Sequence, residues 1–452
     1  MPSGDRKAAR PAGYGRRPGH FMTVSSVSSA SVNKHLIKMA LAAGMASYLG
    51  SSLIVSVGIA IAIWQISFAM SAWSVGIVSG GLTLAIAAGA LVGGPLADRF
   101  GHHRIFNIAI IVFALGAALM ALASNADMLV LAAVIGGLSS GAALPASVAL
   151  LSERAPQDAQ ARLVSFTQVM WTVGIAGSMG FGFVFSGVGL TGARIIFTML
   201  ALTGLVTFVA SAFGGVFGAA PVSSVPDEGM DSAPSGFALA RLFRDPVLRR
   251  TTVLIILFYI CWGLLANTFG QFQNYFLVMV SGASQTFATG LSVAIEIVVL
   301  ALAVTYVRLV DTRFRNPVFY VGAAAIVVAM VMLAVSGGSQ LSLVIIGLCL
   351  YQFGCCFAGE ATYKVWTQES FPARARASAL GLSYAVSRFV CAGFAFVTPS
   401  ILAASATLFL WTLAGLALAA LVFGAGVIAN LNRRGIVPGP RHAASAISKA
   451  LA

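Results

Sequence analysis

Charged side chains are scarce in this sequence. Asp, Glu, Lys and Arg make up only 9% of its 452 residues, whereas a soluble domain carries about 25%. Acidic residues are the rarer kind, at 13 against 27 basic ones. Apolar residues make up 59% of the chain. This balance excludes a soluble enzyme, a disordered chain and a fibrous repeat.

The residue patterns of common nucleotide and metal sites are also missing. The sequence has no Gly-x-x-x-x-Gly-Lys loop and no His/Asp metal cluster. Its five cysteines lie within apolar runs and lack the spacing of a zinc site. We therefore expect no metal, no cofactor and no enzymatic activity. The formal charge of +14 comes from basic residues between apolar runs, which favours membrane topology over nucleic acid as its cause.

Long apolar runs dominate what remains. Twelve of them are bounded by charge, Gly or Pro, and each suits a span of about 20 residues. We expect helices at 38–65, 73–97, 105–124, 128–151, 162–186, 191–217, 251–280, 285–310, 317–336, 340–367, 376–401 and 405–430. The sequence therefore predicts an all-α membrane protein with twelve transmembrane helices.

Hydrophilic segments divide the chain, and their basic residues predict its orientation. We expect an N-terminal tail at 1–37, six-helix bundles at 38–217 and 251–430, a central loop at 218–250 and a C-terminal tail at 431–452. Met22 is an alternative start to Met1. Of the 27 basic residues, only Arg194 falls on the far side, and Lys364 and Arg388 fall within spans. Because basic loops stay inside, both tails and the central loop should be cytoplasmic.

Two loop motifs recur about half a chain apart. Residues 94–104 read GPLADRFGHHR after the second span, and residues 311–316 read DTRFRN after the eighth. Residues 153–156 read ERAP, with Arg162 beyond, and residues 369–372 read ESFP, with Arg376 beyond. Two matched pairs at a similar offset indicate an internal duplication. The two six-helix bundles should therefore be pseudo-symmetric.

The G-x-L-A-D-R-x-G loop at 94–101 resembles the signature of the major facilitator superfamily, and the likeness covers about residues 38–430. The E-x-x-P-x-x-x-R pattern at 369–376, and Arg388 followed by Pro399, resemble its sugar-porter and metabolite–proton symporter branch, in particular inositol-transporter-like members. Span 1 departs from proton-coupled sugar porters, because Tyr48-Leu49-Gly50-Ser51 stands where they usually carry an aspartate. The resemblance implies secondary active transport of a small polar metabolite, favouring a polyol or sugar, by alternating access. We expect a monomer in the plasma membrane.

The same resemblance implies a latch formed by loop charges. Asp98 would face the start of span 11, while Arg99 and Arg104 would face Glu153. By the repeat, Asp311 would face the start of span 5, and Arg313 or Arg315 would face Glu369. The full latch set is Gly94, Asp98, Arg99, Gly101, Arg104, Glu153, Asp311, Arg313, Glu369 and Arg376. The alternative is that these charges only set topology.

Three charges lie deep in predicted spans. Counting from charged residues at the span ends at about 1.5 Å per residue, Glu360 lies about 13 Å inside, and Glu296 and Arg388 about 18 Å, in a core about 30 Å thick. Removal from water favours a neutral carboxyl group, so Glu360 and then Glu296 are candidate proton carriers. Lys364 is spaced to pair with Glu360 on one helix face, and a purely structural ion pair is the alternative.

Polar side chains within spans provide candidate substrate ligands. Amides and tyrosine suit hydroxyl groups, which need donors and acceptors, although amides also bond between helices. The candidates are Gln168, Trp171, Asn267, Gln271, Gln273, Asn274, Tyr275, Lys364 and Arg388. Arg388 and Lys364 equally suit an organic-acid–proton symporter, and the apolar surface a drug efflux antiporter. A non-transporting membrane sensor would be expected to carry a sizeable soluble domain.

Overall fold

The computed structural model describes residues 29–154, 157–214, 243–310, 312–371 and 373–436. These ranges are helical apart from short turns and one 3-10 turn, η1 (Ser186–Val188). The first six helices are α1 (Ser29–Ser67), α2 (Ala72–Phe100), α3 (His102–Leu122), α4 (Ala126–Arg154), α5 (Gln157–Phe185) and α6 (Leu190–Phe213). The others are α8 (Pro246–Met279), α9 (Gln285–Leu309), α10 (Arg315–Ser336), α11 (Leu341–Phe357), α12 (Glu360–Ser370), α13 (Ala373–Ala404) and α14 (Ala406–Arg433).

The helices agree with the predicted all-α membrane protein. Within the described residues, 11 segments are long and apolar enough to cross a membrane. Val169–Phe185 of α5 is a shorter apolar segment and lies within the fifth predicted span, 162–186. The first spanning segment is Lys38–Ser67, although α1 itself begins at Ser29. The predicted tails and central loop lie largely outside the described residues.

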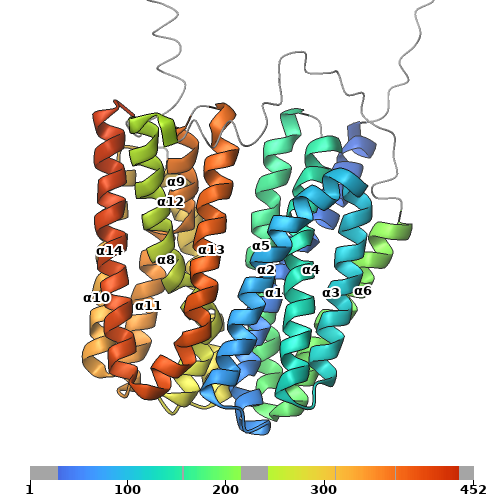
Figure 1. Cartoon of the computed structure of the whole chain (residues 1–452), viewed down its shortest axis with the longest axis vertical. Coiled ribbons are helices and arrows are strands. Elements are labelled where there is room, and N and C mark those ends of the chain that lie inside the picture. The colour runs from blue at the N-terminus through green and yellow to red at the C-terminus, as the bar shows by residue number, and fades with distance from the viewer. Residues whose placement is uncertain (1–28, 155–156, 215–242, 311, 372, 437–452) are drawn as a thin grey trace, which may run out of the picture.

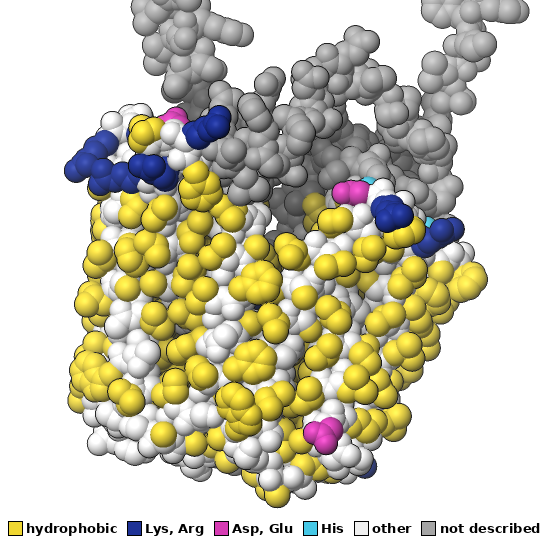
Figure 2. Space-filling view, viewed as in Figure 1, with side chains coloured by type: hydrophobic (Ala, Val, Ile, Leu, Met, Phe, Trp, Pro, Cys, Tyr) yellow, Lys and Arg dark blue, Asp and Glu magenta, His cyan; other side chains and the backbone are white. Residues whose placement is uncertain are grey.

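Two groups of helices stand side by side, α1–α6 in one and α8–α14 in the other (Figure 1). Hydrophobic side chains cover the visible flanks of both groups, and Lys and Arg gather at the upper end (Figure 2). We call this upper end, where Gly101 and Arg313 lie in loops, the basic end. The opposite end carries the turns at 68–71 and 280–284.

Turn residues explain why the helices start where they do. Ser71, Ser284 and Ser405 each accept a hydrogen bond from a backbone amide three residues ahead. Asp245 Oδ1 accepts from the Val247 amide at 2.8 Å, directly before Pro246. These caps satisfy amides that a helix leaves unpaired at its first turn. Gly101 separates α2 from α3 with a φ of 93°, which only glycine adopts readily.

Among the described residues, the hydrogen bonds between the two bundles lie in the helix halves nearest the opposite end. Gln271 Nε2 of α8 donates to Thr83 Oγ1 of α2 at 2.7 Å. Gln285 Nε2 of α9 donates to the carbonyl oxygen of Ile59 in α1 at 2.9 Å. The bundles diverge toward the basic end (Figure 1). This arrangement closes the opposite end and separates the bundles at the basic end.

The prediction of one continuous helix over 340–367, the tenth span, is wrong. The structure divides it into α11 and α12, because the backbone leaves helical geometry at Ala358 and Gly359, where Gly359 has φ −120° and ψ −150°. Thr362 Oγ1 donates to the Phe357 carbonyl oxygen at 2.8 Å, which satisfies an acceptor beside the break. Broken helices are tolerated in membranes where such groups are satisfied or line a cavity.

Candidate functional site

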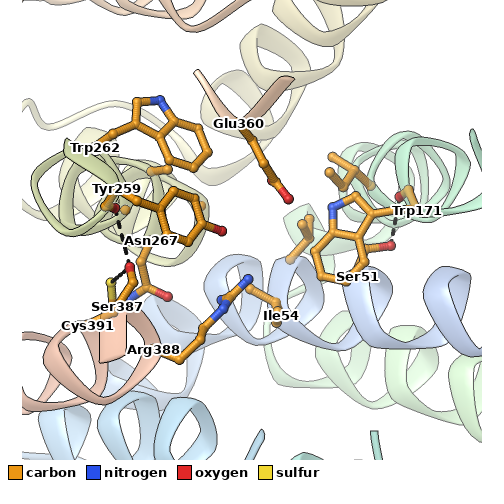
Figure 3. A pocket seen from close by; sticks show the side chains of 15 residues that line it. Ser51, Ile54, Trp171, Tyr259, Trp262, Asn267, Glu360, Ser387, Arg388 and Cys391 are labelled. Atoms are coloured by element: carbon orange, nitrogen blue, oxygen red, sulfur yellow. Dashed lines mark hydrogen bonds between the residues drawn. The ribbon is translucent and has the colours of Figure 1, made fainter. Parts of the chain in front are cut away.

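A cavity of about 240 Å³ lies between the bundles, at mid-height of the spans. Figure 3 shows its walls, which come from two helices of the first bundle and three of the second. The lining residues are Ser51, Ile54, Val55, Trp171, Ile175, Tyr259, Trp262, Gly263, Ala266, Asn267, Gly270, Glu360, Ser387, Arg388 and Cys391. Both bundles therefore contribute to one site.

Glu360 enters the cavity because the helix break places it there. It is the first residue of α12, directly after Gly359, and a carboxylate is favourable at a helix N-terminus. Lys364 Nζ lies 2.9 Å from Glu360 Oε1, one turn further along α12. The expected pair is therefore present, and its carboxylate faces the cavity (Figure 3).

Arg388 points into the same cavity from α13 (Figure 3). Its guanidinium carbon lies 4.9 Å from the centre of the Tyr384 ring, a cation–π distance. The ion pairs between described residues do not include Arg388. Glu360 and Arg388 thus bring opposite charges to one cavity from different helices, and only Glu360 has an ionic partner among the described residues.

The remaining walls combine fixed hydroxyl groups with aromatic surfaces. Ser51 Oγ donates to the carbonyl oxygen of Trp171 at 2.8 Å, which joins α1 to α5. Ser387 Oγ donates to the Tyr259 carbonyl oxygen at 3.3 Å, which joins α13 to α8. Asn267 Oδ1 accepts from Gln271 Nε2 at 3.1 Å, so the Asn267 amide group keeps its donors for the cavity.

The predicted amide cluster of span 7 divides between two roles. Asn267 lines the cavity, whereas Gln271 is buried against α2 through its bond to Thr83. Gln273 Nε2 donates to Ser292 Oγ of α9 at 2.9 Å, and Ser292 Oγ donates to Asn274 Oδ1 at 3.3 Å. Most of these amides thus bond between helices in this conformation, as the alternative allowed.

Two further candidates lie away from the cavity lining, and the side chain of a third lies outside the described residues. Tyr275 is buried with its ring 6.1 Å from that of Phe272. The side chain of Gln168 lies outside the described residues, one turn before Trp171, which does line the cavity. Glu296 is buried on α9 beside the thiol of Cys356 and does not line the cavity.

Among the described residues, the loop charges that form ion pairs do so within one bundle. Asp98 is 77% exposed, and its Oδ1 lies 3.0 Å from His102 Nε2. The guanidinium groups of Arg99 and Arg313 lie over the rings of Phe100 and Phe314. Arg104 is exposed, Gly94 has open space about it, and Gly101 forms the turn between helices. The side chains of Glu153 and Arg376, and residue Asp311, lie outside the described part of the chain.

Of the two arginines predicted as alternatives, Arg313 and Arg315, it is Arg315 that forms an ion pair with Glu369. Its two terminal nitrogens lie 2.9 Å and 2.8 Å from the two oxygens of Glu369. The Arg315 side chain is only 2% exposed, so this bidentate pair is well shielded from water. It joins α10 to α12 within one bundle, and fixes α12 at the basic end.

Several cavity residues were not among the predicted ligands. Tyr259, Trp262 and Ser387 line it beside the predicted Asn267 and Arg388. Positions 259, 263, 266, 267 and 270 repeat at helical spacing along α8. That stripe was visible in the sequence, but a mixture of Tyr, Gly, Ala and Asn does not distinguish a cavity wall from a helix contact.

Comparisons with known proteins agree with this arrangement. The family model of the Major Facilitator Superfamily matches residues 40–395. The minor myo-inositol transporter IolF of Bacillus subtilis is 28% identical, over 81% of this chain and 84% of its own. The glucose transporter GlcP of Staphylococcus epidermidis is 24% identical over 68% of this chain and 74% of its own. A crystal structure of a D-xylose-proton symporter is similar in fold, with a TM-score of 0.71, 19% identity, and coverage of 86% and 97% of the two chains.

Proposed function

The chain belongs to the major facilitator superfamily of membrane transporters, and we propose that it carries a small polyhydroxylated metabolite together with a proton. The cavity between the bundles supports this proposal most directly. It measures about 240 Å³, below the roughly 300–1,000 Å³ of drug-binding pockets, which favours a polyol or sugar over drug efflux. The myo-inositol and glucose transporters among its relatives favour the same substrates.

Alternating access requires the bundles to close the two ends in turn around this cavity. In this conformation the contacts of Gln271 and Gln285 close the opposite end. The reverse state would separate these contacts and bring the loops of the basic end together. The two bundles of one chain together line the cavity, and we propose that a monomer is sufficient for transport.

Coupling to protons would act through Glu360. Its carboxylate reaches the cavity and pairs with Lys364 at 2.9 Å. A proton on Glu360 would neutralise the carboxylate and release Lys364, which could loosen α12 at the break after Ala358. Glu296 is the second candidate, because it is buried on α9.

The basic end should face the cytoplasm of the cell membrane. Arg99, Arg104 and Arg313 are exposed there, and basic loops are retained inside. A reporter enzyme that works only in the cytoplasm should therefore be active when it is fused after Ala452. A reporter that works only in the periplasm should be inactive there. Activity of a periplasm-dependent reporter at that position would contradict the orientation and the twelve-span topology together.

Asp98 should matter for turnover more than for substrate binding. Its hydrogen bonds and ion pairs among the described residues include none to the other bundle, and its proposed contact with the start of α13 belongs to the reverse state. A latch contact worth about 1.4 kcal/mol would change the balance of states about tenfold. We expect Asp98→Ala to slow exchange by about that factor, with the dissociation constant nearly unchanged. The matched control is Asp127→Ala, an acid at the opposite end; equal exchange by both variants would contradict the latch.

Uptake into proteoliposomes tests the proposed function as a whole. Labelled myo-inositol, hexoses and their acids would be supplied outside, with and without an imposed proton gradient directed inward. We expect at least one polyhydroxylated compound to accumulate above its external concentration only when the gradient is present. Failure of every compound to enter or exchange would contradict this substrate class.

A further inference from the structure

Arg388 uses its N–H donors differently from Arg315, which forms an ion pair within its bundle. Arg315 gives two nitrogens to Glu369 at 2.9 Å and 2.8 Å and is 2% exposed. A guanidinium group has five N–H donors and no acceptor. For Arg388, the hydrogen bonds and ion pairs between described residues include no acceptor. Its guanidinium group faces the cavity instead (Figure 3).

Charge in the site is unbalanced as a result. Among the residues that line the cavity, Glu360 is the carboxylate and it already pairs with Lys364 at 2.9 Å, so the lining offers no second carboxylate to Arg388. Among the described residues, the other titratable groups that interact with Glu360 or Arg388 are the hydroxyl groups of Tyr259, Tyr363 and Tyr384 and the thiol of Cys391. Such groups are neutral near pH 7, so they do not supply the missing negative charge.

An uncompensated cation within a membrane is costly and indicates a functional partner. The Tyr384 ring at 4.9 Å gives Arg388 a cation–π contact worth about 0.5–2 kcal/mol, which orients it without neutralising it. A carboxylate of a ligand would complete a second ion pair beside Glu360 and Lys364. Arginine binds a carboxylate through two parallel N–H bonds, and the cavity-facing donors of Arg388 leave that geometry available.

The rest of the cavity suits the remainder of such a ligand. Asn267 directs its amide into the cavity with its oxygen already bonded to Gln271, so its N–H donors can meet hydroxyl oxygens. Trp171 and Trp262 add aromatic walls on two sides (Figure 3). A compact molecule with several hydroxyl groups and one carboxylate would use both kinds of wall.

We propose that the substrate is a polyhydroxylated monocarboxylate, and that Arg388 binds its carboxylate. This inference rests on the proposed transport of a polyhydroxylated metabolite and narrows its class. The chain should prefer a sugar acid to the neutral polyol or sugar of the same carbon skeleton, because the neutral compound leaves Arg388 without an anion.

Matched pairs of compounds test this directly. Binding of D-gluconate and D-sorbitol, and of D-glucuronate and D-glucose, would be measured by calorimetry on the purified full-length chain. Each pair differs at one carbon, which carries either a carboxylate or an uncharged group. A charge-assisted bidentate contact should make each acid bind about tenfold or more tightly than its neutral partner.

Substitution of Arg388 provides a second, independent test of the proposal. Arg388→Gln should remove the advantage of the acids and leave neutral compounds within about twofold of their wild-type affinity. Arg194→Gln, at an exposed arginine of α6, should retain the full advantage of the acids. If Arg388→Gln does not fold, the ratio of acid affinity to neutral-compound affinity in the wild-type protein decides whether the substrate carries a carboxylate.

The outcomes separate this inference from the proposed function beneath it. Neutral compounds that bind wild-type protein as tightly as their acids would overturn the assignment of a carboxylate substrate but leave polyol or sugar transport standing. Retention of the acid preference by Arg388→Gln would overturn the role of Arg388. If none of the four compounds binds and none of the wider panel is transported, the proposed function fails and the inference fails with it.

Discussion

Glu360→Gln should abolish accumulation of substrate driven by a pH gradient while leaving exchange across the membrane intact. Glutamine keeps the size of the side chain and removes its ability to carry a proton. In the structure, Glu360 faces the cavity and holds Lys364 at 2.9 Å, so a fixed neutral side chain imitates the protonated state. The variant should still reorient with substrate, because exchange needs no net proton movement. Proteoliposome uptake with an imposed gradient, beside counterflow without one, measures the two separately.

Glu296→Gln is the matched comparison for this result. Glu296 is also a carboxylate within the spans of the second bundle, but it is buried away from the cavity lining. We expect its substitution to have a smaller effect on accumulation. If Glu360→Gln accumulates substrate with wild-type pH dependence, Glu360 is not the carrier. If only Glu296→Gln then loses accumulation, the proton site lies on α9.

Gly76→Val should slow transport by obstructing closure of the opposite end. A Cβ atom at Gly76 in α2 would overlap the backbone carbonyl of Phe396 in α13, and one at Gly80 would overlap the Phe396 ring. Overpacking typically costs about 1–3 kcal/mol, which lowers the population of this closed arrangement by roughly 5- to 150-fold. Exchange in proteoliposomes should fall by a factor in that range.

Gly81→Val controls for the effect of valine on the helix itself. Gly81 also lies in α2, but a Cβ there meets nothing within 4 Å. It should insert and exchange substrate at close to the wild-type rate. If Gly76→Val exchanges as fast as Gly81→Val at equal protein levels, the close approach of α2 and α13 is not required during the transport cycle.

The helices themselves were predictable because membrane spans depend on long apolar runs, which are visible in sequence. Eleven described segments meet that criterion, and each corresponds to an expected span. The break at Ala358 and Gly359 was not visible, because the apolar run continues through it and the backbone geometry depends on neighbouring helices. Thr362 satisfies the Phe357 carbonyl only once the chain is folded.

The placement of candidate site residues was predictable where depth and helical spacing were sufficient. The spacing of Glu360 and Lys364 anticipated their pair, and the depth of Arg388 placed it at the level of the cavity. Sequence could not say which helix face meets the other bundle. For that reason Gln273 and Asn274, which bond to Ser292, could not be distinguished in advance from Asn267, which lines the cavity.

The most direct measurement of proton-coupled transport is the pH inside proteoliposomes when substrate alone is added outside. A pH-sensitive dye would be trapped in the lumen, with no gradient imposed beforehand and with ion permeability provided to prevent a membrane potential. The polyhydroxylated compound that the chain exchanges should acidify the lumen as it enters, and Glu360→Gln should exchange that compound with no change in pH. Net entry of the compound into wild-type vesicles at constant lumen pH would contradict proton coupling.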